Sequence, residues 1–214
     1  MPALYKLTDA ELARSLDEIR HEARRRTQAA VKDAATIIKG QEMSKRAVTV
    51  AAAGSHSILF VGPPGQGKTM LRALLAALGH DESYEARPCP CGFRNDLVCT
   101  CTVAKLERHF AKLPQTEITM EVPRVPAREL AARTPGIDLA EIRAAIDHAA
   151  HYSDLTLDED NNNLLRAAAS ELHISAARRE STVRVARTIA NLDNSETIRP
   201  MHLCEAINYH MRLF

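Results

Sequence analysis

The chain has 214 residues, enough for one ordinary domain or for a small core with an appended helical subdomain. Its 28 Lys and Arg residues nearly balance its 27 Asp and Glu residues, so the net charge of +1 excludes any argument for nucleic-acid or membrane binding from overall charge. No segment reaches about 18 consecutive apolar residues, and the N-terminus lacks a signal-peptide pattern. We therefore expect a soluble, cytoplasmic protein without a membrane partner.

The first part of the chain is predicted to alternate helices with one short strand. A helix is expected over residues 8–39, because Thr8 and Glu11 form a capping box and apolar residues follow at helical spacing. A second helix is predicted over 42–53. The β-rich run SILFV at 57–61 comes next, followed by a glycine-rich turn and a third helix. This order of strand, turn and helix is the context that a phosphate-binding loop requires.

The rest of the chain is predicted to be helical apart from one strand. Residues 102–113 have a helical pattern, and EITMEV at 117–122 alternates like a strand. Further helices are predicted near 127–133, 138–151, 158–173, 175–192 and 200–213. The fold class is therefore α/β and helix-rich, with a short parallel sheet followed by an all-helical subdomain.

The turn after the first strand has the spacing of a P-loop, with Gly62 followed by four residues and then Gly67, Lys68 and Thr69. In such a loop the backbone N–H groups wrap phosphate oxygens, the lysine adds positive charge and the threonine hydroxyl ligates magnesium. The alternative is a chance glycine-rich turn. We predict nucleotide binding, with magnesium at Thr69, by Gly62, Pro63, Pro64, Gly65, Gln66, Gly67, Lys68, Thr69 and Met70.

The residues that hydrolysis requires are not evident, and no catalytic residue is assigned. P-loop ATPases hold magnesium with an acid at the end of a second core strand. The best candidate, LTLDED at 155–160, is more typical of a helix N-terminus with acids facing the dipole. Only His80 to Pro88 separate the loop helix from the next motif, whereas a single parallel crossover takes about a dozen residues.

Four cysteines form that motif, and a fifth, Cys204, is expected in the core. Four thiolates on two short knuckles suit tetrahedral zinc, which would stabilise a loop that has little core of its own. The alternative is a set of reduced, partly buried thiols without metal. A catalytic zinc is disfavoured because four cysteine ligands leave no open position. The candidate zinc ligands are Cys89, Cys91, Cys99 and Cys101.

Four blocks of the chain resemble, in order, the YifB/ComM proteins, AAA+ ATPases related to the ATPase subunit of magnesium chelatase. The blocks are IIKGQEMSKRAVTVAAAGSHSILFVGPPGQGKTML (37–71), RPCPCGF with CTC (87–101), MEVPRV (120–125) and VRVARTIANLDNSETIRPMHLCEAINY (183–209). The resemblance implies ATP and magnesium as cofactors, a core of strand order 5-1-4-3-2, a helical lid and assembly into homo- or hetero-oligomeric rings. For the ComM members it implies DNA as a partner, in branch migration.

The sequence also departs from this family. The stretch that holds strands two and three and the acidic motif has no counterpart, so the resemblance implies a truncated sheet of order 5-1-4. Strand four is expected as a stub at 84–87 with an exposed edge. Arg87 stands where the family has a sensor asparagine, and residues 114–117 lack the candidate arginine finger. The second-sensor arginine is also missing, and Arg178 and Arg179 are the candidates to replace it.

These patterns divide the chain into an N-terminal helical segment (1–40), a truncated P-loop AAA+ core with a Cys-rich insert at 87–101 (41–125) and a helical C-terminal lid (126–214). We predict an ATP-binding protein of this family with weak or no hydrolysis of its own. The alternatives are an active DNA branch-migration motor in a mixed ring, a nucleotide-independent DNA- or protein-binding module, and a marginally folded deletion remnant.

Overall fold

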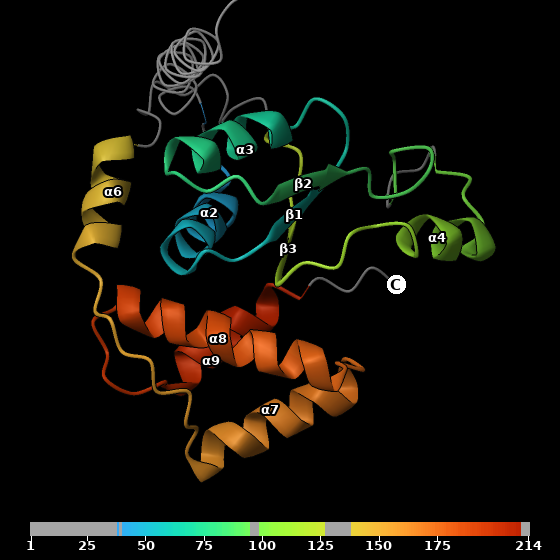
Figure 1. Cartoon of the computed structure of the whole chain (residues 1–214). Helices are drawn as coiled ribbons and strands as arrows, with labels where there is room; N and C mark the ends of the chain where they lie inside the picture. The colour runs from blue at the N-terminus through green and yellow to red at the C-terminus, as the bar shows by residue number, and fades with distance from the viewer. Residues whose placement is uncertain (1–37, 39, 95–98, 127–137, 211–214) are drawn as a thin grey trace, which may run out of the picture.

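A computed structural model describes residues 38, 40–94, 99–126 and 138–210 of the chain (Figure 1). The helices predicted over 8–39 and 127–133 lie outside the described residues, apart from Ile38 in the first of them. Among the described residues, no helix is both long and apolar enough to cross a membrane. The strands are β1 (Ile58–Val61), β2 (Ser83–Ala86) and β3 (Ile118–Glu121), and the helices are α2 (Glu42–Gly54), α3 (Lys68–Ala77), α4 (Val103–Phe110), α6 (Leu139–Asp147), α7 (Glu159–Glu171), α8 (Ala176–Leu192) and α9 (Pro200–Asn208).

The described strands form one parallel sheet of order β2-β1-β3. Central β1 is buried along its whole length, as expected for a parallel strand covered on both faces. Helix α3 supplies the crossover from β1 to β2. Since β3, β1 and β2 occupy the positions expected for strands 5, 1 and 4, the truncated sheet order is confirmed. Strand β2 forms one edge of the described sheet, as predicted for strand four, and Tyr84 on it is 41% exposed.

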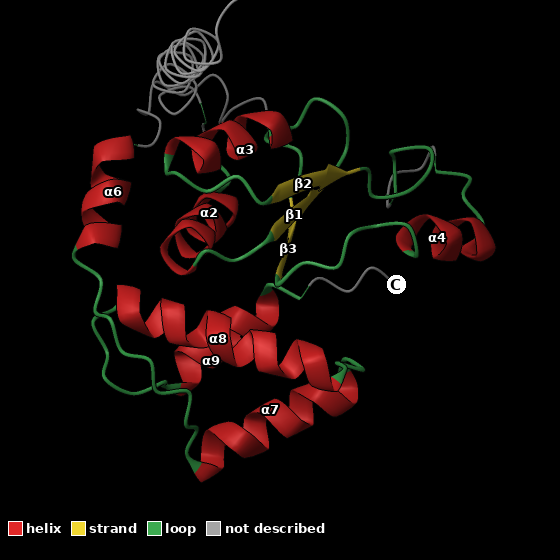
Figure 2. Cartoon of the chain, in the orientation of Figure 1, coloured by secondary structure: helices red, strands yellow, loops and turns green. Residues whose placement is uncertain are grey.

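Helices α7, α8 and α9 form a group beside the sheet (Figure 2), and one hydrophobic core joins both parts. Helix α3 lies against β2, and α2 contacts both β3 and α8. Asp158 caps α7 by accepting a hydrogen bond from the backbone N–H of Asn161, so the acids of LTLDED do begin a helix, as predicted. Buried residues of this shared core include Val48, Phe60, Leu71, Ile118, Ile189 and Leu203.

Two predictions at the C-terminal end were wrong. The last helix, expected over 200–213, ends at Asn208, because the next residues run beside β3: Thr119 N donates to Tyr209 O at 2.8 Å, and Thr119 forms a β-bridge with His210. Cys204 is exposed rather than in the core. Its neighbour Leu203 takes the buried position, and successive helix residues point about 100° apart.

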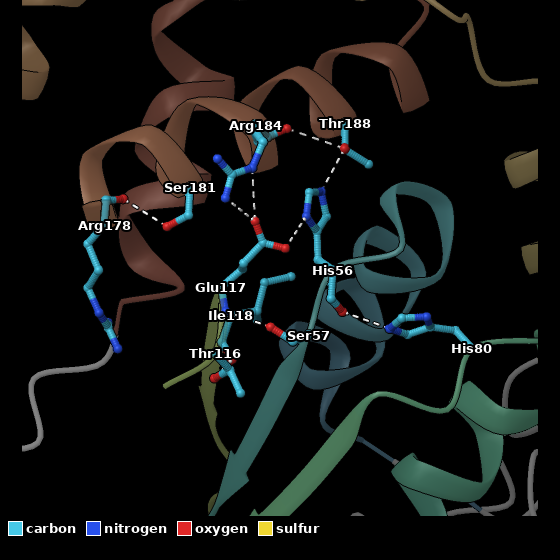
Figure 3. A network of polar contacts seen from close by, with 10 residues as sticks. All are labelled: His56, Ser57, His80, Thr116, Glu117, Ile118, Arg178, Ser181, Arg184 and Thr188. Atoms are coloured by element: carbon cyan, nitrogen blue, oxygen red, sulfur yellow. Dashed lines mark hydrogen bonds and ion pairs between the residues drawn. The ribbon is translucent and has the colours of Figure 1, made fainter. Parts of the chain in front are cut away.

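A polar network, buried at His56 and Thr188 and exposed at Arg184, connects the start of β1 and of β3 to α8 (Figure 3). His56 Nδ1 donates to Glu117 Oε2 at 3.0 Å, and His56 Nε2 lies 2.8 Å from Thr188 Oγ1. Arg184 Nη2 donates to Glu117 Oε1 at 2.7 Å. The hydrogen bond from His56 outweighs burial and, with that from Arg184, lowers the pKa of Glu117 to about 2. Glu117 therefore stays ionised and bonds the sheet to the helical part.

Replacing Glu117 by Gln should destabilise the fold, because His56 and Arg184 would lose a charged acceptor. Such bonds contribute about 1.5 to 3 kcal/mol. Since the folded-state pKa lies below the ordinary 4.5, this contribution is present above pH 4.5 and declines as the pH falls toward about 2. Urea unfolding of wild type and Glu117→Gln from pH 7 to pH 2.5 measures this loss.

Glu121→Gln serves as the control for this experiment, because Glu121 is an exposed acid at the other end of the same strand. Its stability should follow the wild type throughout the pH range. A difference between Glu117→Gln and wild type that does not shrink in acid would contradict the role of the Glu117 charge.

Candidate functional site

The segment between β1 and α3 has the backbone of a phosphate loop. Gly65 and Gly67 adopt left-handed conformations, with φ of 76° and 84°, which side chains other than glycine rarely tolerate. Gly62 packs so closely on the end of β3 that an added Cβ would lie 2.3 Å from the carbonyl oxygen of Val122. Glycine is therefore required at these three positions for different reasons, and α3 begins immediately after the loop at Lys68.

The side chain of Lys68 folds back over the loop. Its Nζ donates to the carbonyl oxygens of Gly62 at 2.9 Å and Pro63 at 2.8 Å, and the residue is 9% exposed. Burial lowers the pKa of Lys68, and the nearby Glu85 opposes this effect. The ammonium group is thus held at the loop by neutral acceptors, which a phosphate oxygen could replace.

A cavity of about 390 Å³ opens between the loop and the end of β2. Its volume lies within the range of about 300–1,000 Å³ for small-molecule sites. Gln41 Nε2 donates to Gln66 O at 2.8 Å and so holds the loop from the α2 side. The lining residues are Pro64, Gly65, Gln66, Gly67, Lys68, Thr69, Met70, Glu85, Ala86 and Arg87. The structure therefore brings most of the predicted nucleotide-binding residues to one cavity.

Two charged residues of β2 and its end reach this cavity, and sequence reasoning gave neither a role in the site. Thr69 Oγ1 donates to Glu85, 3.2 Å from Oε2 and 3.4 Å from Oε1. Arg87 also lines the cavity, and its carbonyl oxygen accepts a hydrogen bond from His109 of α4 at 2.8 Å. The sequence signal that could have found them is strand alternation, because Glu85 and Arg87 are two residues apart and residues at this spacing on a strand share a face.

The proposed substitutes for the second-sensor arginine lie elsewhere. Arg178 Nη1 is 3.2 Å from His210 Nδ1, and burial lowers the pKa of Arg178. Arg179 lines a different cavity, together with residues of α7 such as Asn162. Neither arginine lines the cavity at the phosphate loop.

The four clustered cysteines have the geometry of a metal site. Their Sγ atoms lie within 4.8 Å of one another, with Cys89 3.1 Å from Cys91 and 3.9 Å from Cys99. Hydrogen bonds from the Cys89 thiol and then from the Phe93 backbone lower the pKa of Cys91 to about 7. Tetrahedral zinc with bonds of about 2.3 Å places its sulfur ligands about 3.8 Å apart, so the cluster could hold a metal.

The cysteine cluster also rests against the phosphate loop. Gly92, with φ of 86°, lies in the turn between the cysteines, and its backbone N–H donates to Cys89 O at 3.0 Å. A Cβ at this position would contact Pro64 Cδ at 3.4 Å. The turn that carries Cys89 and Cys91 therefore lies beside Pro64, which lines the cavity.

Comparison with known proteins gives two matching family models. The model for magnesium chelatase, subunit ChlI, matches residues 34–87, and the model for the C-terminal part of the same subunit matches residues 118–210. Together they cover more than half of the chain. The cysteine cluster lies in the segment between the two matches.

Curated relatives match a short stretch of the chain. The competence protein ComM of Haemophilus influenzae is 60% identical over 43 residues, which are 20% of this chain and 8% of the relative. YifB of Escherichia coli is 47% identical over 51 residues, and YifB of Salmonella typhimurium is 45% identical over the same number; each match covers 22% of this chain and 10% of the relative. The matches thus span about a tenth or less of the curated relatives' length. With the two family models and the parallel sheet around its phosphate loop, the chain belongs to the magnesium-chelatase-like AAA+ family of ComM and YifB, with a truncated core.

Proposed function

We propose that this protein binds ATP with magnesium at the Gly62–Met70 loop and hydrolyses it weakly or not at all. The observation that supports binding is the loop itself, whose glycine conformations and buried Lys68 enclose one side of a cavity of about 390 Å³ at the start of α3. The free backbone N–H groups of the first turn of α3 point from the helix N-terminus toward the loop, which favours an anion at the N-terminus of α3.

The residues of the cavity have separate tasks in this proposal. Lys68 exchanges the carbonyl oxygens of Gly62 and Pro63 for phosphate oxygens, which carry more negative charge. Arg87, at the opposite wall, adds a second positive charge. Magnesium, when bound with the nucleotide, would compensate the negative charge of the phosphates, and the Thr69 hydroxyl would hold it.

Weak hydrolysis follows from the groups that are missing around this cavity. Among the described residues that line it, Glu85 is the one acid, and it already faces Thr69. An arginine finger contributes about 10³ to 10⁵ in rate, and residues 114–117 lack the arginine that the family resemblance would place there. Neither Arg178 nor Arg179, the candidates to replace the second-sensor arginine, lines the cavity. The proposed role is that of a regulatory or adaptor subunit. Ring assembly and a DNA partner are part of this proposal through the family resemblance alone.

Lys68→Ala tests the proposed binding site. Removing the ammonium group should weaken ATP binding about ten- to hundredfold, the loss expected for one charge-assisted hydrogen bond. Calorimetry with ATP and magnesium measures this change. Lys45→Ala is the matched control, because Lys45 is also buried, at 7% exposed, but pairs with Glu42 in α2. Equal affinity of wild type and Lys68→Ala would refute the site, as would the absence of binding to the wild-type chain.

Phosphate release tests the proposed lack of hydrolysis. The isolated chain should release phosphate from ATP at a rate indistinguishable from that of Lys68→Ala. Robust wild-type turnover that Lys68→Ala abolishes would contradict the proposal and favour an active enzyme. Turnover that appears only after mixing with a full-length relative, such as YifB of Escherichia coli, would favour the motor in a mixed ring.

We also propose that the cysteine cluster holds structural zinc. The support is the spacing of the four Sγ atoms, which all lie within 4.8 Å of one another and so approach the separations of a tetrahedral site. A Cys₄ site leaves no open coordination position, so its role is to fix the fold. Through the contact of Gly92 with Pro64, this turn would also hold the phosphate loop in place.

Cys99→Ser tests this zinc site. Purified wild-type protein should contain one zinc per chain by elemental analysis, and Cys99→Ser should contain little and melt about 5 to 10 °C lower. Cys204→Ser is the control, because Cys204 is exposed on α9 outside the cluster. Purified protein that contains no zinc, and whose Tm is unchanged by Cys99→Ser, would contradict the zinc site and leave the alternative of reduced thiols without metal.

A further inference from the structure

The Thr69 hydroxyl, to which a P-loop assigns magnesium, faces a carboxylate that the family pattern does not predict. Glu85 Oε2 lies 3.2 Å from Thr69 Oγ1 at the wall of the cavity. Octahedral magnesium with bonds of about 2.1 Å places adjacent oxygen ligands about 3.0 Å apart. The separation of these two oxygens is therefore close to that of neighbouring ligands of one magnesium ion.

The position of Glu85 in the truncated sheet explains how it reaches Thr69. Strand β2 pairs directly with β1, and Glu85 is opposite Phe60, two residues before the loop begins. Ser83 and Glu85 share the face of β2 toward α3, since residues two apart point the same way. Strand β2 therefore carries the Glu85 carboxylate to the edge of the cavity beside the loop.

The Glu85 carboxylate is also held in place from α3. Arg72 Nη1 donates to Glu85 Oε1 at 3.3 Å, and Arg72 Nε donates to Ser83 Oγ at 3.2 Å. One guanidinium thus binds two residues of the same strand face and fixes the direction of the carboxylate. Oε2 is the carboxylate oxygen closer to the Thr69 hydroxyl.

We propose that Glu85 is the acid that holds magnesium beside Thr69, in place of the acid on the strand that this chain lacks. This inference rests on the proposed ATP binding and assigns the metal to a residue of this chain alone. Glu85 keeps magnesium at the site but does not orient an attacking water, because its carboxylate faces Thr69 and Arg72. The site would therefore bind magnesium with ATP without efficient turnover.

Glu85→Gln separates the charge of this residue from its shape. ATP affinity is measured by calorimetry in excess EDTA and in excess magnesium. Magnesium should tighten ATP binding to the wild-type chain about tenfold or more. In Glu85→Gln the same addition should tighten ATP binding less than about threefold. In EDTA the variant should bind ATP as tightly as wild type or more tightly, because a negative charge beside the phosphates is gone.

Two controls accompany this test. Glu82→Gln removes an exposed acid immediately before β2 and should keep the full magnesium effect. Thermal unfolding verifies that each variant is folded, and Glu85→Ala repeats the measurement if Glu85→Gln is unstable. Loss of the magnesium effect in Glu85→Gln, with ATP binding retained in EDTA, supports the inference.

The outcomes distinguish this inference from the proposed function. A magnesium effect of the same size in Glu85→Gln and wild type overturns the role of Glu85 and leaves ATP binding intact. A wild-type chain that binds ATP in neither buffer overturns both. Weakened binding of Glu85→Gln in EDTA also overturns the inference, because it would show that Glu85 acts on the loop and not through the metal.

Discussion

The pairing of β1 with a parallel strand on each side is the constraint on which the remaining structure depends. A buried strand must have its backbone groups bonded, and β2 and β3 do this for all of Ile58–Val61. The same pairing continues at the loop: Gly62 N donates to Ala86 O at 3.2 Å, and Val122 N donates to Val61 O at 2.8 Å. The phosphate loop therefore leaves the sheet from a fixed point. Strands two and three of the family can be absent because neither one contacts β1 in the order 5-1-4-3-2.

The same residues that depart from the family pattern have new contacts in this fold. Glu117 lies in the segment where the family has its candidate arginine finger, yet here it joins β3 to α8 through His56 and Arg184. Arg178 and Arg179, the candidates for a second sensor, lie away from the phosphate loop. The helical part is thus bonded to the edge of the sheet opposite β2. Helices that respond to a nucleotide need side chains that reach its phosphates. Among the described arginines, the one that lines the cavity is Arg87, which follows β2 and does not belong to the helical part.

The phosphate loop has neighbouring segments on three sides. Gln41 bonds the loop from the segment before α2, Val122 packs on Gly62 from β3, and Gly92 of the cysteine turn lies beside Pro64. Lys68 completes the enclosure by bonding two loop carbonyls. A preformed loop lowers the entropic cost of binding a nucleotide, since few groups have to become ordered. The family resemblance assigns the acidic motif to strands that have no counterpart in this chain, and this is why the proposed function combines nucleotide binding with weak hydrolysis.

The sequence by itself determined the α/β class and the P-loop spacing, because glycine spacing and short-range periodicity are local properties of the chain, whereas the 5-1-4 order of the strands was implied by the family resemblance. It also determined the start of α7 at Asp158, where the capping side chain acts on the next turn. Only the tertiary structure decided the role of Glu85, since strand alternation gives its face but not its 3.2 Å approach to Thr69 across a crossover. The same holds for the His56–Glu117–Arg184 network, the exposure of Cys204 and the end of α9 at Asn208. Each of these depends on which distant segment packs against it, and that contact is formed only when the sheet and the helices share one core.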